Sequence, residues 1–153
     1  MPAFGIPAFV LPNIPPGKVV QIVSATNGSQ VVSSSSVYAD TGLTATITPT
    51  SAANKVLVFV IQVGCAKDTS NTGLALRLFR NAVQIAQVES ALGSTASVAA
   101  NYVGATGGCY VDLPATNTAV IYKTQFASVQ NTGSVYVGVS GCTSSIVLVE
   151  ITT

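Results

Sequence analysis

The alternation that decides the fold runs Leu43-Thr44-Ala45-Thr46-Ile47-Thr48-Pro49. Apolar residues take every second position and threonine takes the positions between them. This period of two is typical of a β-strand with one buried and one solvated face. The same period recurs in residues 74–79, 135–140 and 146–149, where the second face also carries apolar residues. We therefore expect a nearly all-β chain, in which these later strands are covered on both faces.

Turn-forming residues divide the chain into about eight short strands, the spacing typical of a sandwich. The strongest hairpin signal is Asn27-Gly28, because both residues tolerate the positive φ of a type I′ turn. Further breaks are predicted at 41–42, 48–49, 67–73, 80–82, 104–108, 113–118, 131–133 and 141–145. Residues 89–100 hold enough alanine for a short helix, but Gly93 and the Ser/Thr content favour a strand or loop. The predicted architecture is an antiparallel double-sheet jelly-roll sandwich, with other sandwiches as the alternative.

Composition argues against most enzymes and against nucleic-acid binding. The 153 residues are the length of one domain, the net charge is +1, and only 7% of residues are charged, against about 25% in ordinary domains. Histidine, the commonest general base and metal ligand, is absent. The five carboxylates are scattered, and residues 138–141 lack the spacing of a nucleophile elbow. We expect no catalytic residues, no cofactor, no metal and no nucleic-acid partner.

Neither a membrane span nor a disulfide framework is predicted. The longest apolar run, residues 56–61, is far shorter than the roughly 20 residues a spanning helix needs. Prolines near the N-terminus prevent the helix of a signal peptide, so we expect neither membrane insertion nor secretion by a cleavable signal. The cysteines Cys65, Cys109 and Cys142 lack metal-site spacing, and their odd number favours small buried thiols.

Residues 1–16 are predicted to form an extended arm, separate from a β-domain over residues 17–153. An imperfect five-residue repeat starts at Pro2, Pro7 and Pro12, and no charged side chain precedes Lys18. Proline favours polyproline-like geometry, in which about 15 residues at roughly 3.1 Å each reach about 45 Å. The large apolar side chains of this arm are Phe4, Ile6, Phe9, Val10, Leu11 and Ile14. The free energy gained by burying these side chains is about equal to the conformational entropy cost of ordering the backbone. We therefore expect the arm to become ordered only against a partner. A loose tail or an added edge strand on the same subunit is the alternative.

Several segments, taken in their order along the chain, resemble a domain of bacteriophage virion proteins. These segments are residues 17–24, 37–49, 51–58 and 76–81 and the closing strand 145–151. The domain occurs at the ends of tail fibres and in head-decorating proteins, and it looks like the trimeric jelly rolls of tumour necrosis factor. The resemblance covers about residues 17–151 and implies a homotrimer. One departure is Asn81-Ala82, where the family usually has Asn-Gly; this predicts a longer loop or a different turn.

Aromatic residues with a polar tip are suited to a seam between subunits. The candidate trimer-interface residues are Tyr38, Tyr102, Tyr122, Tyr136 and Arg77. Arg77 is expected either to pair with a carboxylate across the subunit boundary or to lie exposed on an outer strand. Some of the tyrosines are expected to belong to the core.

The leading functional hypothesis is a bacteriophage capsid decoration (cement) protein. It would be a homotrimer that stabilises the head shell through its N-terminal arm and trimer base, with the major capsid protein as its partner. It would be assembled in the host cytoplasm and lie on the head surface of the virion. The alternative is a tail-fibre or short-fibre tip that binds a host receptor through loops at 67–73, 104–108 and 131–133. A secreted cytokine-like ligand would need a secretion route that this N-terminus does not provide.

Overall fold

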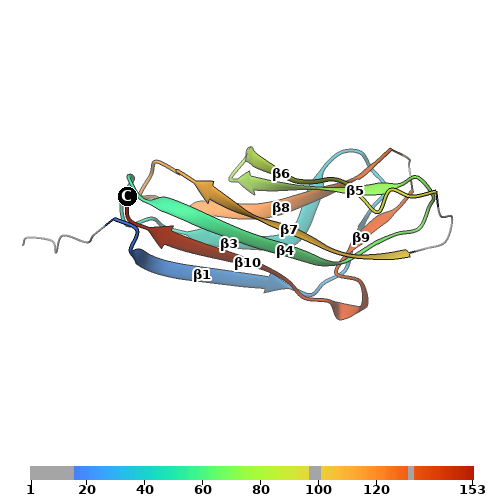
Figure 1. The fold of residues 1–153 in the computed structure, drawn as a ribbon, viewed down its shortest axis with the longest axis horizontal. Coiled ribbons are helices and arrows are strands. Elements are labelled where there is room, and N and C mark those ends of the chain that lie inside the picture. The colour runs from blue at the N-terminus through green and yellow to red at the C-terminus, as the bar shows by residue number, and fades with distance from the viewer. Residues whose placement is uncertain (1–15, 97–100, 131–132) are drawn as a thin grey trace, which may run out of the picture.

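A computed structural model describes residues 16–96, 101–130 and 133–153 (Figure 1). Over this part of the chain the structure is all-β, as predicted, with one 3-10 turn, η1 (Val139–Gly141). The described residues form ten strands, which exceeds the expected count of about eight. The strands are β1 (Val19–Asn27), β2 (Val31–Ser33), β3 (Ala39–Ile47), β4 (Lys55–Lys67), β5 (Gly73–Arg80), β6 (Val83–Leu92), β7 (Asn101–Asp112), β8 (Val120–Val129), β9 (Val135–Val137) and β10 (Ser144–Ile151).

Two antiparallel sheets pack against each other, which confirms the predicted β-sandwich (Figure 1). Sheet A follows the order β1-β10-β4-β9-β2, with β7 on the free side of β4. Sheet B follows the order β3-β8-β5-β6. β4 is the longest strand and the centre of sheet A. One of its sides pairs with β7, and the other pairs first with β10 and then with β9.

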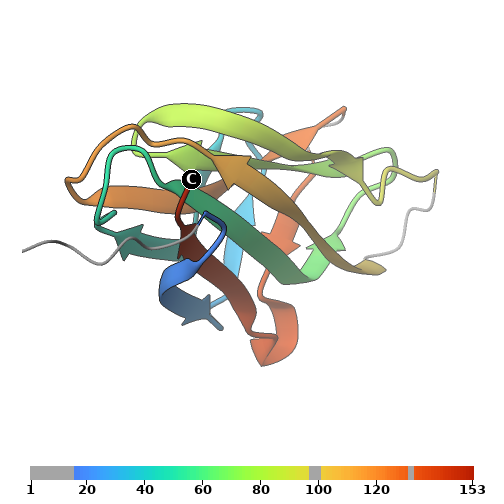
Figure 2. The same ribbon diagram turned by 60° about the vertical axis from the view of Figure 1, so that its left-hand side comes forward.

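The strands pair in a nested order. β5 pairs with β6, β4 with β7, β3 with β8, β2 with β9, and β1 with β10. The chain is therefore one long antiparallel ribbon that doubles back at the β5–β6 turn and is then folded into two layers. As a result, the start of β1 and the end of β10 lie side by side in both views (Figure 1, Figure 2).

The core between the sheets confirms the alternation of β3. Leu43, Ala45 and Ile47 are buried, whereas Thr44 and Thr46 face outward and are exposed. The leucines at 74, 76 and 78 are buried as well. Two core clusters result, one on each half of the sandwich, and the larger also takes Val56, Val58 and Val60 of β4 with Ile146 and Leu148 of β10. The expectation that strands with two apolar faces are covered on both is not met within one chain, because the outer side chains of β10 are only half-buried.

The predicted hairpin at Asn27-Gly28 is wrong. β1 pairs with β10 and β2 pairs with β9, so the two strands flanking this turn are not neighbours. Instead, the Asn27 side chain accepts a hydrogen bond from Ser29 N and donates one to the Thr41 carbonyl. Asn27 thereby holds the crossing from β1 to β2 in place, a role that uses its local hydrogen bonding rather than positive φ.

Two glycine-containing segments predicted as breaks lie inside strands. Gly42, at φ +83°, sits in β3 where the register with β8 shifts between Asp40 and Thr44, so this feature is a β-bulge. Residues 104–108 belong to β7 and pair with β4. Glycine is needed at 107 because β7 runs so close to β4 that a Cβ there would collide with the Val60 carbonyl oxygen. The prediction of a loop there is wrong.

The β5–β6 connection agrees with one further expectation, and the cysteines correct another. The turn contains only Asn81 and Ala82, with positive φ at Asn81, so it is a different turn from type I′ but not a longer loop. Cys65 is buried, as predicted for small thiols, whereas Cys109 and Cys142 are exposed. Side chains alternate along β7, and Cys109 lies on the outward side of that strand. No other part of the described chain covers this side.

Candidate interaction surfaces

The outer face of sheet A is apolar, although no other part of the described chain covers it. β4 alternates strictly here: Val56, Val58 and Val60 point into the core, so the intervening residues point outward. We call this surface the apolar face; its residues are Leu57, Phe59 and Ile61 of β4, Val147 and Val149 of β10, Cys109 and Val111 of β7, and Ile22 of β1.

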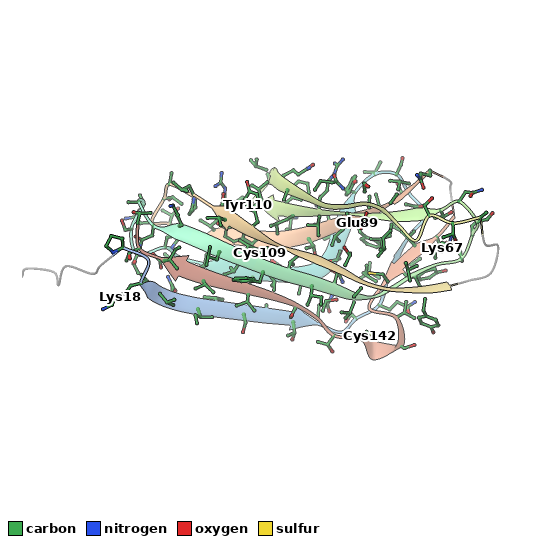
Figure 3. The ribbon with its side chains drawn as sticks, viewed as in Figure 1. Lys18, Lys67, Glu89, Cys109, Tyr110 and Cys142 are labelled. Atoms are coloured by element: carbon green, nitrogen blue, oxygen red, sulfur yellow. The ribbon has the colours of Figure 1, made fainter. Side chains whose placement is uncertain are left out.

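Register places these side chains in cross-strand rows. One row joins Ile22, Val149, Leu57 and Val111, and the next joins Val147, Phe59 and Cys109. Phe59 is 43% exposed and Ile61 46%, large fractions for such residues in mid-sheet. Cys109 lies over the middle of this sheet (Figure 3). Contiguous exposed apolar surfaces are typical of interaction sites, so this face is a candidate interaction surface.

The outer face of sheet B is polar by contrast. Lys123 forms an ion pair with Asp40 at 2.8 Å, and Gln125 donates to the same carboxylate at 2.7 Å. Burial opposes ionisation of Asp40, but the hydrogen bonds from Lys123 and Gln125 hold its pKa below the ordinary value. Thr44 and Thr46 of β3 complete a hydrophilic surface. The two faces of the sandwich therefore differ sharply in the partner they suit.

Arg77 and Tyr38, two of the predicted interface residues, come together on sheet B. The Arg77 guanidinium stacks 3.6 Å from the centroid of the Tyr38 ring, and its Nε donates to Gln87 Oε1 at 2.9 Å. Arg77 thus has an aromatic and an amide partner within its own chain. Nothing in the sequence indicated this pair, because Tyr38 precedes β3 whereas Arg77 lies on β5.

The other predicted tyrosines separate into core and surface. Tyr122 is fully buried between the sheets, and its hydroxyl donates to Asp112 at 2.6 Å. Burial, with a further contribution from Asp112, raises the pKa of this phenol. Tyr122 is therefore a core residue with no surface to offer a second subunit, which corrects its assignment to an interface. Tyr102 is 72% exposed and Tyr136 is half-buried, and both line one pocket in sheet A.

The six arm residues Phe4, Ile6, Phe9, Val10, Leu11 and Ile14 lie outside the described residues. The root of the arm is described: Gly17 N donates to the Thr152 carbonyl at 2.9 Å, and Thr152 N donates to the Lys18 carbonyl at 3.0 Å. Lys18 and Lys67 lie at opposite ends of the sandwich (Figure 3). Gly17, the root of the arm, therefore lies at the end of the sandwich opposite the loop at 68–72.

A buried carboxylate links several segments at the same end of the sandwich. Glu150 is fully buried and accepts hydrogen bonds from Asn54 Nδ2 at 2.6 Å, Gln21 Nε2 at 2.6 Å and Thr50 N at 2.7 Å. Burial alone would raise its pKa, but the bonds from Asn54, Gln21 and Thr50 outweigh burial and keep the pKa below the ordinary value. Ionised Glu150 thus ties β1 and the β3–β4 connection to β10.

Within the described ranges, no group of three or more His, Cys, Asp or Glu side chains is placed to hold a metal ion. The Asp68 carboxylate accepts hydrogen bonds from Thr69, Ser134 and Tyr136. No helix of the described chain is long and apolar enough to span a membrane. No protein-family model matches the sequence, and no curated protein matches it either.

Sequence reasoning named tyrosines for the interface and missed the apolar face. The sequence does indicate this face: residues 56–61 are apolar at every position, so both faces of that strand carry apolar side chains. The same holds for residues 146–149. Such strands are expected to be buried on both faces, whereas the outer side chains of β4 and β10 are exposed or half-buried in the described chain.

Proposed function

We propose that this protein is a structural subunit of a bacteriophage particle: a homotrimer that decorates and stabilises the capsid shell. The observation that carries the proposal is the apolar face of sheet A, which lies opposite a hydrophilic sheet B. A β-sandwich with one such face gains free energy by covering it with copies of itself. The low charge and absence of histidine suit a role in which surfaces are buried and no proton is moved.

The winding of the chain supports the finer assignment to a jelly roll. Five nested pairs, folded into two sheets, are what an antiparallel ribbon gives when it is rolled into a sandwich. The segments that resemble phage virion domains include most of β1, all of β3, the first four residues of β4, the second half of β5 and most of β10. Three of these strands lie in sheet A, the sheet that carries the apolar face.

In this proposal the arm attaches the trimer to its surroundings. Hydrogen bonds from Gly17 and to Lys18 join its root to Thr152 at one end of the body, so the arm begins from a fixed place. Apolar side chains on the arm bind the shell or a neighbouring subunit. Contacts that are weak for one arm add up over a trimer, because binding of the first arm raises the effective concentration of the others.

The trimer is tested with two matched substitutions. Phe59 and Ile121 are 43% and 44% exposed, but Phe59 lies on the apolar face and Ile121 on the outer face of sheet B. We expect light scattering after size exclusion to give three chains per particle for the wild type and for Ile121→Asp, and monomers for Phe59→Asp. A monomeric wild-type protein would overturn the proposal.

The role of the arm is tested by truncation. A chain beginning at Gly17 should still form trimers, because the described body and its apolar face are intact. It should fail to attach to capsids that lack the protein, as measured by co-sedimentation with particles. Normal attachment of the truncated chain would remove the arm from the mechanism.

A receptor-binding fibre tip is a second candidate, favoured by one observation. The loop at 68–72 lies at the end away from the arm root, where a tip would present its binding loops (Figure 3). Abundance in purified particles separates the two functions. A decoration protein is present in numbers comparable with the capsid protein, whereas a fibre tip is present in few copies.

A further inference from the structure

Two tyrosines face each other across a small residue on the outside of sheet A. Tyr102 of β7 pairs with Ala66 of β4, and Ala66 pairs with Tyr136 of β9. Residues paired across antiparallel strands project on the same face, so the three side chains form one row. The row lies near the Lys67 end of β4, on the far side of the bulge that follows Gln62. We call it the tyrosine slot.

The slot is a real hollow with aromatic walls. Its volume is about 180 Å³, and its remaining lining comes from Gln30, Lys67, Asp68 and Val139. The tyrosine Cα atoms are two strand spacings apart, about 9.6 Å, and Ala66 forms a low floor between them. A cavity of about 150 Å³ is enough to bind benzene, so the slot has room for one small ring.

The charged groups around the slot already have partners. Asp68 accepts hydrogen bonds from Tyr136 Oη at 3.1 Å and from Ser134 N at 2.7 Å. Lys67 is buried, and its ammonium donates to the carbonyl and hydroxyl oxygens of Thr95. The side-chain amide of Gln30 makes no hydrogen bond within the described residues. The slot therefore suits an uncharged, apolar ligand with carbonyl groups near the rim.

We propose that the tyrosine slot binds the proline-rich arm, residues 2–16, of another copy of this chain. Proline-rich segments in the polyproline II form dock in aromatic-lined grooves, and their unpaired carbonyls accept hydrogen bonds at the rim. The arm holds five prolines, among them the spacing Pro12-x-x-Pro15, and no charged side chain. Its chemistry and that of the slot therefore match.

The position of the arm root favours a second copy over the same chain. The root lies beside Ile151, which pairs with Lys55, whereas the slot lies at Ala66. Eleven residues of strand separate these points, about 36 Å. An arm reaching its own slot would have to run along the apolar face, which the proposed function assigns to subunit contacts. The inference rests on the proposed function at this step, and it makes each arm a link from one subunit to the next.

The test uses the full-length chain with a photoreactive benzoylphenylalanine at Phe9. Illumination is expected to give covalent dimers on a denaturing gel, with the crosslinked peptide containing Tyr102 or Tyr136. Ala66→Leu fills the floor of the slot and should lower the dimer yield about tenfold, since overpacking excludes the ligand. Ala53→Leu, at an exposed turn, should leave the yield unchanged.

Three results would overturn the inference: crosslinks to the slot within single chains, crosslinks that map elsewhere, or a dimer yield insensitive to Ala66→Leu. These results leave the proposed function standing if truncation of the arm still abolishes attachment to capsids. Conversely, attachment without the arm would remove the arm from the proposed function even if the slot crosslinks form. The two proposals therefore fail separately.

Discussion

Arg80 and Asp112 join the two sheets of the sandwich: the guanidinium Nη1 lies 2.9 Å and 3.0 Å from the two carboxylate oxygens. Arg80 ends β5 in sheet B, and Asp112 ends β7 in sheet A. The same carboxylate accepts the hydroxyl of buried Tyr122. One side chain thus satisfies a cation and a phenol at once.

Replacing Asp112 with alanine should lower the free energy of unfolding by about 3 kcal/mol, because it leaves both a partly buried guanidinium and a buried hydroxyl without their acceptor. Chemical denaturation followed by fluorescence measures the change. Asp40→Ala is the matched control, since it breaks the surface ion pair with Lys123 and should cost within about 0.5 kcal/mol. Equal losses of unfolding free energy in both variants would show that the Arg80–Asp112 link between the sheets stabilises the fold no more than a surface ion pair does.

Glu150 should make stability depend on pH. Its pKa is lower in the folded chain than the ordinary value of about 4.3, so the folded state holds fewer protons than the unfolded state around that pH. The stabilisation is therefore complete above about pH 5 and is lost as pH falls through the folded pKa. Glu150→Gln should be less stable than wild type at pH 7, with the difference shrinking below pH 4. Asn54→Ala, which removes one of the bonds that lower the pKa, should shift the loss to higher pH.

The thiols offer a direct measure of the apolar face. Cys109 lies beside Phe59 on that face, whereas Cys142 lies in the exposed turn before β10. In the proposed trimer, iodoacetamide at pH 8 should modify Cys142 rapidly and Cys109 slowly, as read by mass spectrometry. Cys65 should resist modification because burial raises the pKa of its thiol to about 11. Rapid labelling of Cys109 in the native protein would contradict coverage of this face, and the monomeric Phe59→Asp variant serves as its positive control.

Two adjacent glycines in β7 should respond differently to alanine. A Cβ on Gly107 would collide with the Val60 carbonyl, whereas a Cβ on Gly108 would have its nearest neighbour, Val88 Cγ1, at 3.9 Å. Gly107→Ala should cost about 1 to 3 kcal/mol in unfolding free energy, since the β4 backbone cannot move aside. Gly108→Ala should be neutral or slightly stabilising. Thermal melts of both variants decide the matter, and a tolerated Gly107→Ala would mean that β7 can shift away from β4.

The features that were predictable from sequence are those set by burial period. β3 could be predicted because Leu43, Ala45 and Ile47 face the core while threonines face water, and no helix has that period. The hairpin at Asn27-Gly28 could not, because a turn signal is local whereas the partner of β1 is set by β10, more than a hundred residues later. The glycines of β7 led to a wrong prediction of a loop for a related reason. Their small size allows β4 to approach closely, and that contact cannot be read from the sequence.

The interaction surfaces divide in the same way. The apolar run at 56–61 carried enough information to expect a strand that repels water on both sides. The pairing of Tyr102 with Tyr136 across Ala66 depends on the register of three strands. The stacking of Arg77 on Tyr38 likewise depends on a contact between separate elements. Side chains from distant strands meet only after the ribbon is rolled, so pattern and spacing could not foresee these pairs.

The nested pairing also orders events during folding. Contacts between β5 and β6 close a short loop, whereas those between β1 and β10 close nearly the whole chain, so contact order rises steadily from the tip of the ribbon outward. We expect strand pairing to begin with β5 and β6 and to proceed pair by pair toward β1 and β10. During synthesis β1 stays unpaired until β10 has been made, so the hydrogen bonds of Gly17 and Lys18 with Thr152 are among the last contacts to form. The base of the arm is then fixed only after the sandwich behind it is complete, which under the proposed function would keep unfinished chains from assembling too early.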